Sequence, residues 1–110
     1  MQSIRDGKIE PVLSIIDAGF PVNAPVLEFG ATIAMHVTAT CSADFLSQIM
    51  ARGADLNASD ELGRTAIHFA CRAGKEDTFR VLVDNDEVDV DAVTNAGVTP
   101  LMMAIESGNV

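Results

Sequence analysis

The stretch GRTAIHFA at residues 63–70 returns as GVTPLMMA at residues 97–104, 34 positions later. A second stretch, GFPVNA at residues 19–24, returns as GADLNA at residues 53–58 with the same spacing. A repeat of this period is typical of a solenoid, in which one small structural unit is stacked many times along an axis. The spacing therefore predicts a chain of stacked units, an architecture that needs no single active site.

Three segments have the spacing of apolar residues that is typical of amphipathic helices: residues 7–18, 44–52 and 77–84. Shorter alanine-rich segments precede them, and residues 65–73 are the clearest example. Because little polar surface remains in that segment, the helix that it forms must be packed between neighbouring helices. Small residues such as Ala70 would let those neighbours approach closely. The pattern therefore predicts pairs of antiparallel helices.

Polar segments separate the predicted helix pairs. Residues 57–63 and 90–97 each end in a glycine and are interpreted as turns with polar tips. Thr65 and Thr99 stand where a side-chain oxygen would cap the first turn of the following helix. Pro100 occupies the first position of one such helix, where proline is favoured.

The size and composition indicate one domain. The chain has 110 residues, of which 48% are hydrophobic, so it holds enough apolar side chains for a core. Its longest uncharged stretch, residues 29–43, is too short to span a bilayer, and we expect no membrane insertion. The N-terminus has no basic region followed by an apolar one, so we expect no secretory signal in this chain.

The charge balance is strongly acidic. Acidic residues outnumber basic ones by 16 to 7, the net charge is −9, and no Lys or Arg follows Arg80. Phosphate binding needs clustered Lys and Arg, so we expect no nucleic acid partner. Five carboxylates crowd into one short run: Asp84, Asp86, Glu87, Asp89 and Asp91. Because valines stand where a calcium loop needs ligands or glycine, we interpret the run as a solvated acidic rim, with an acidic docking patch as the alternative.

The two cysteines are too few for a disulfide framework. Cys41 and Cys71 each lie in an apolar stretch predicted to be helical, and we interpret both as reduced packing residues. This interpretation places the protein inside the cell, in the cytoplasm or the nucleus.

The order of turn, alanine-rich helix, amphipathic helix, glycine and hairpin resembles the ankyrin repeat. Residues 60–92 show the resemblance most fully, through DELGRTAIHFA, Gly74 and VLV, and GADLNA matches the lead-in of the family's hairpin. The resemblance implies an all-α fold, an α-solenoid of stacked helix-turn-helix repeats with projecting hairpin loops. It divides residues 1–110 into a partial repeat (1–24), two repeats (25–58 and 59–92) and a second partial repeat (93–110), and a segment of a longer array is expected.

No catalytic or metal-binding pattern stands out. His68 and His36 have too few neighbouring ligands for a closed metal site. The resemblance implies that such a histidine is structural and bonds to the backbone near the turn. With His36 as the counterpart of His68, the hairpin after Asn23 is two residues longer than the one after Asn57. We also find no nucleophile turn and no phosphate-binding loop, so no enzyme activity and no cofactor are expected.

The resemblance implies that a protein partner binds the hairpin tips and the exposed positions of the inner helices, which line a concave face. Leu62 and Phe29 stand out, because a turn tip is a poor place for a large apolar side chain, although Phe29 could instead tuck onto the neighbouring hairpin. Arg64 and Arg72 would form a small basic spot suited to an acidic partner segment. The expected binding residues are Leu62, Arg64, Arg72, Glu61, Ala73, Phe29, Asn95 and Val98, with Glu28 and Thr40 at further positions of this kind.

The function that we expect is therefore a non-catalytic protein–protein interaction module, a scaffold or adaptor segment of a larger protein. Two alternatives stay open: a small soluble regulator that caps a partner protein, or targeting repeats of an enzyme whose catalytic domain lies outside this chain. Residues Leu101, Met102, Met103 and Ile105 would lack a covering helix, so self-association through uncapped ends is also expected.

Overall fold

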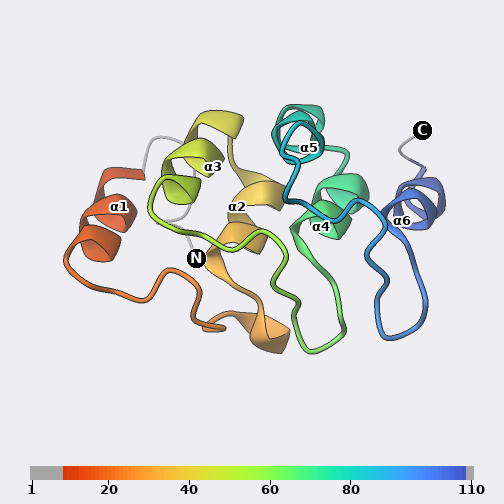
Figure 1. The fold of residues 1–110 in the computed structure, drawn as a ribbon, viewed down its shortest axis with the longest axis horizontal. Coiled ribbons are helices and arrows are strands. Elements are labelled where there is room, and N and C mark those ends of the chain that lie inside the picture. Colours follow the sequence, from red (N-terminus) through yellow and green to blue (C-terminus); the bar gives the residue numbers. More distant parts are fainter. Residues whose placement is uncertain (1–8, 109–110) are drawn as a thin grey trace.

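The computed structural model describes residues 9–108, which form a row of short helices with loops projecting to one side (Figure 1). The described part contains no β-strand. Its helices are α1 (Ile9–Asp17), the 3₁₀ turn η1 (Glu28–Gly30), α2 (Ile33–Thr40), α3 (Ala43–Met50), α4 (Ala66–Ala73), α5 (Glu76–Val83) and α6 (Pro100–Glu106). The prediction of an all-α solenoid is confirmed.

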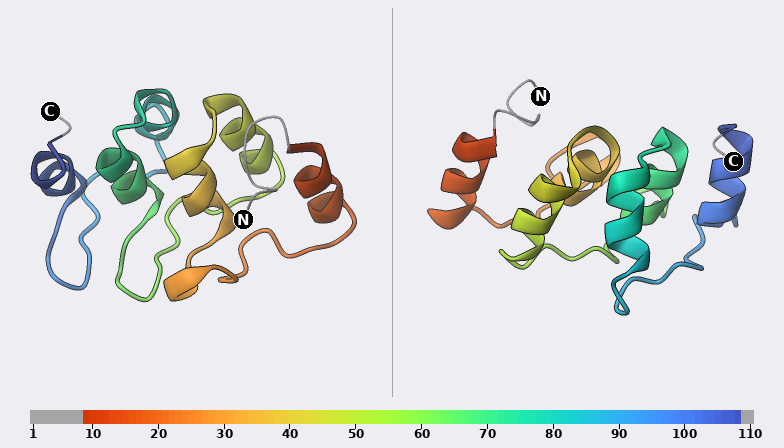
Figure 2. Two further views of the ribbon diagram at one scale, coloured as in Figure 1. Left: turned by 180° about the vertical axis from the view of Figure 1, so that it is seen from behind. Right: turned by 90° about the horizontal axis from the view of Figure 1, so that it is seen from above.

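The helices form two layers. The inner layer holds α2, α4 and α6, and the outer layer holds α1, α3 and α5, as the two further views show (Figure 2). Inner and outer helices pack in the pairs α2 with α3 and α4 with α5. The most extensive contacts join α4 to α2 on one side and to α6 on the other. The alanine-rich helix is thus enclosed between neighbours, as its sequence predicted.

Each layer contributes to one continuous core. Ala66 and Ala70 of α4 are almost completely buried, and their small side chains allow close approach of α2 and α6. The outer helices supply the large apolar side chains, which are fully buried: Phe45, Leu46, Ile49 and Leu82. Cys41 and Cys71 are both buried and are not joined in a disulfide, and burial raises the pKa of the Cys71 thiol.

Polar side chains cap the N-terminal ends of three helices. The side-chain oxygens of Thr32, Ser42 and Thr99 each accept a hydrogen bond from the backbone N–H three residues later, at 3.2–3.4 Å. Pro100 follows the Thr99 cap at the first position of α6. The predicted cap at Thr99 is confirmed, whereas Oγ1 of Thr65 lies instead 3.1 Å from Nδ1 of His68.

Two asparagine side chains form hydrogen bonds to the backbone of the following unit. The Asn23 side chain donates to the carbonyl of Gly53 (3.0 Å) and accepts from the N–H of Asp55 (2.7 Å). Asn57, 34 positions later, donates to the carbonyl of Glu87 (2.6 Å) and accepts from the N–H of Asp89 (2.9 Å). The amide satisfies a donor and an acceptor of the neighbouring backbone together, so it fixes the spacing between units.

His68 joins α4 to the loop that follows α5. Its ring is fully buried, with Nδ1 3.1 Å from the N–H of Thr65 and Nε2 2.9 Å from the carbonyl oxygen of Val98. A carbonyl can only accept, so Nε2 carries the proton and Nδ1 accepts from Thr65. The interpretation of His68 as a structural residue is confirmed.

The structure corrects the position assigned to His36. The sulfur of Met35 lies 3.4 Å from the N–H of Thr32, the contact that His68 makes with Thr65. Met35 is therefore the counterpart of His68, and the loop between Asn23 and the helix cap is one residue longer than its successor, not two. The expectation failed because the extra residue lies between Asn23 and Leu27, before the cap, and shifts the register of α2 by one position.

We predict that His68→Ala lowers the free energy of unfolding by about 2–4 kcal/mol, because the buried N–H of Thr65 loses its partner, the Val98 carbonyl keeps only its bond from Thr94, and the buried ring leaves a cavity. Urea unfolding followed by circular dichroism measures the change. His68→Met is the matched control: methionine can keep the contact to Thr65, as Met35 does with Thr32, but not the one to Val98. Its loss should be smaller, and equal losses for the two variants would contradict these roles.

Candidate functional site

Three hairpin loops lie side by side along one edge of the molecule (Figure 1). They are residues 27–31, 60–64 and 94–98, and in each the first N–H donates to the carbonyl of the last residue at 2.9–3.0 Å. This closed geometry repeats in all three, so the loops present their tips at equivalent places in successive units.

Backbone hydrogen bonds connect the tips to one another. The N–H of Glu61 donates to the carbonyl of Phe29 (2.7 Å), and the N–H of Asn95 donates to the carbonyl of Leu62 (3.0 Å). The Asn95 side chain adds a bond to the carbonyl of Glu61 (2.9 Å). The tips therefore form one connected row and not three independent loops.

Side-chain oxygens hold the second and third loops from within. Oδ1 of Asp60 accepts from the N–H groups of Leu62 (3.0 Å) and Arg64 (2.8 Å). Oγ1 of Thr94, 34 positions later, accepts from the N–H groups of Ala96 and Val98, both at 3.2 Å. Because Asp and Thr bond their own backbone in this way, the loop conformation is set locally.

Arg64 lies beneath the tips and is held by internal contacts. Its Nε donates to Oδ2 of Asp60 at 2.8 Å, and the Arg64 side chain is only 15% exposed. The guanidinium carbon also lies 4.8 Å from the ring centre of Phe69 and 5.8 Å from that of Phe29, within cation–π range. Its charge is therefore balanced inside the molecule by Asp60.

The structure brings most of the predicted binding residues together. Phe29 and Leu62 are exposed at the tips, at 55% and 45%, and Glu61 and Asn95 are exposed beside them. Val98 is half-buried at the base of the third loop.

Two predicted binding residues lie elsewhere. Arg72 and Ala73 are exposed in the last turn of α4, about 10 Å along the helix from its first residue. The basic spot expected from Arg64 and Arg72 is therefore spread over two places.

A hollow of about 560 Å³ lies in the angle between the first loop and the inner helices. Its apolar lining comes from three elements: Val26, Leu27 and Ala31 before α2, Met35 and Ala39 on α2, and Phe69 on α4. Glu28 and His36 complete it. Of these residues only Glu28 was an expected binding position, since no local pattern marks residues that meet only after folding.

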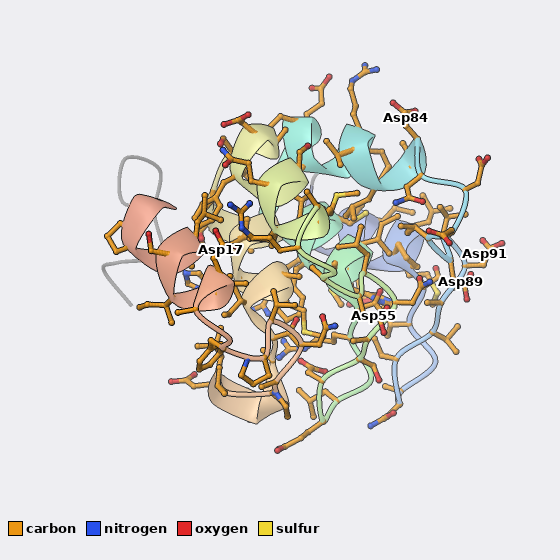
Figure 3. The ribbon with its side chains drawn as sticks, turned by 60° about the vertical axis from the view of Figure 1, so that its left-hand side comes forward. Asp17, Asp55, Asp84, Asp89 and Asp91 are labelled. Atoms are coloured by element: carbon orange, nitrogen blue, oxygen red, sulfur yellow. The ribbon has the colours of Figure 1, made fainter. Side chains whose placement is uncertain are left out.

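The acidic side chains gather at another edge. Asp84, Asp89 and Asp91 lie along it, and Asp17 lies apart from them at the end of α1 (Figure 3). A hydrogen bond from the Arg52 side chain lowers the pKa of Asp17. Within residues 9–108, no group of three or more His, Cys, Asp or Glu side chains is arranged to hold a metal ion.

Comparison with known proteins agrees with the repeat geometry. A family model described as ankyrin repeats (3 copies) matches residues 1–91 and 34–110. The chain belongs to the ankyrin repeat family. Within the part of this ankyrin-repeat chain that is described, no helix has both the length and the apolar character needed to cross a membrane.

Similar proteins include three that are named for notch. The human "Neurogenic locus notch homolog protein 2" is 40% identical over 104 residues, or 94% of this chain. The Xenopus laevis "Neurogenic locus notch homolog protein 1" is 36% identical over 101 residues, or 91% of the chain. The Drosophila melanogaster "Neurogenic locus Notch protein" is 29% identical over 105 residues, or 94%. The chain spans about 4% of the length of each relative.

We predict that Gly63→Ala destabilises the protein more than Gly97→Ala. Both glycines have a φ of 79°, so each alanine variant carries the strain of a left-handed conformation, about 1–2 kcal/mol. At Gly63 the added Cβ would also lie 2.7 Å from the backbone N of Asn95, whereas at Gly97 it meets open space. The extra cost at Gly63 should be about 1–3 kcal/mol. Equal melting temperatures would show that the two tips do not pack together.

Proposed function

We propose that this chain binds a protein partner through its concave face, which we define as the three hairpin loops together with the inner helices α2, α4 and α6. Ankyrin repeats are generally protein–protein interaction modules. The proposal assigns that role to this face, with Phe29, Leu62, Glu61 and Asn95 at the tips and with the neighbouring positions that the sequence predicted.

The exposure of Phe29 and Leu62 is the observation that carries this proposal. Both side chains lie at loop tips, while the backbone groups of these residues already bond to neighbouring loops. Because both side chains stay exposed, they contribute little apolar burial to the stability of the fold. Exposed apolar groups on a rigid frame are typical of protein interfaces, where a few such residues supply most of the binding energy.

The role that we favour is a non-catalytic scaffold or adaptor segment of a larger protein. The relatives named above support it, because each is far longer than the region that this chain matches. A small regulator that caps its partner, or targeting repeats of an enzyme, would bind through the same face. The length of the full gene product distinguishes these roles. The buried thiols of Cys41 and Cys71 support a location inside the cell.

We predict that Leu62→Ala weakens partner binding by about 2 kcal/mol, because an apolar contact at the centre of the interface is lost. The partner is first identified by affinity capture and mass spectrometry, and each variant is then measured by calorimetry. Arg72→Glu, in the last turn of α4 and away from the loop tips, should also weaken binding, since it removes a cation suited to an acidic group of the partner. Asp86→Asn is the control in the acidic run and should alter mainly the association rate and its salt dependence. Loss of binding only in Asp86→Asn would show that the partner uses another face.

We also propose that α6 takes part in self-association. Leu101 and Ile105 are 69% and 56% exposed, and Met102 lies beside them. We predict concentration-dependent association in sedimentation velocity and its reduction by Ile105→Glu, which places a charge on that face. Val93→Glu, at an equally exposed valine outside α6, is the control. A monomer at all concentrations would contradict this proposal.

A further inference from the structure

We propose that the hollow between the first hairpin loop and α2 receives an apolar side chain of the partner, and that Glu28 and Glu61 pair with a basic residue next to it. The partner would then present a short segment in which an apolar residue stands beside Lys or Arg. This inference rests on the proposed function and names the chemistry of the partner at that face.

The hollow has the size and lining of a binding pocket. Its volume of about 560 Å³ lies within the range of about 300–1,000 Å³ that is typical of ligand pockets. Val26 and Leu27 form its loop side, Ala39 its helix side, and Phe69 reaches it from the next unit. Since apolar groups line most of it, burial of an apolar side chain in the hollow would be favourable.

The first loop has a feature that the second loop does not share. Between Asn23 and the cap of α2 there is one residue more than between Asn57 and Thr65, and since loops 27–31 and 60–64 have equal length, the added residue lies within residues 24–26, next to Val26 of the hollow. Phe29 within η1 has a φ of 58°, which residues other than glycine rarely adopt. The bond from Glu61 to the Phe29 carbonyl and the guanidinium of Arg64 near its ring hold this conformation. Glu28 is thereby fixed at the hollow.

The charges near the hollow favour a basic partner. Glu28 lines the hollow, and Glu61 packs so closely over Gly30 that a Cβ there would lie 3.1 Å from the Glu61 side chain. In the part of the chain that the structure describes, neither glutamate takes part in an ion pair. Arg64, the nearby cation, is already bound to Asp60. The two glutamates therefore carry an unbalanced negative charge at this edge, within a protein of net charge −9.

Selection from a random peptide library tests the inference without a known partner. The library is displayed on phage and selected on the whole chain, with counter-selection on Ala39→Trp, which fills the hollow. We expect peptides with an apolar residue next to Lys or Arg. Fluorescence anisotropy should show at least about 10-fold weaker binding of these peptides to Ala39→Trp. Glu28→Gln with Glu61→Gln should weaken the equilibrium affinity, while Glu87→Gln in the acidic run should leave the affinity nearly unchanged and alter mainly the association rate.

The outcomes separate this inference from the proposed function. Acidic peptides, peptides that bind Ala39→Trp unchanged, or no enriched peptides would each overturn the inference. Peptides that lose affinity with Leu62→Ala but not with Ala39→Trp would leave the concave face in place and exclude the hollow. Circular dichroism checks the fold of Ala39→Trp. Val26→Arg, at an exposed position of the rim, is the second variant and should repel the same basic peptides.

Discussion

The packing of α4 between α2 and α6 is the constraint on which the rest of the structure depends. This helix has buried residues on most sides, so it is stable only when both neighbours are present. The small side chains of Ala66 and Ala70 allow the neighbouring inner helices to approach closely. This short distance between inner helices sets the distance between units. Every contact that crosses from one unit to the next has to fit this distance.

Side-chain hydrogen bonds to backbone groups make use of that fixed distance. Asn23 and Asn57 each reach the backbone of the following unit, and His68 reaches the carbonyl of Val98. Such bonds need partners within about 3 Å, so they form only where the repeat is regular. They also satisfy backbone groups of loops that have no strand partner. The loop row is consequently rigid without being a sheet, and its tips are positioned before any partner arrives, which lowers the entropic cost of binding.

The charges divide the surface into regions of different character. Asp84, Asp89 and Asp91 face solvent along one edge, where they favour solubility and affect long-range association more than contact. Arg64 instead forms an ion pair with Asp60, and its guanidinium lies within cation–π range of the rings of Phe29 and Phe69. A positive residue in the sequence is therefore not the same as a positive surface. The edge that carries Phe29 and Leu62 is acidic because the cation beneath it is neutralised internally.

The sequence by itself determined the helical units and the cap at Thr99, because these depend on residues close together in the chain and on a regular period, and the family resemblance implied the structural role of His68. It also placed Phe29, Glu61 and Leu62 at exposed loop tips. Only the tertiary structure decided that Met35, and not His36, is the counterpart of His68, that Arg64 is bound to Asp60, and that Ala39 and Phe69 line one hollow. The physical reason is that one added residue just before the first loop changes the register locally, and its effect depends on contacts with residues about thirty positions away. Sequence spacing reports the average unit, whereas the candidate site lies where one unit departs from it.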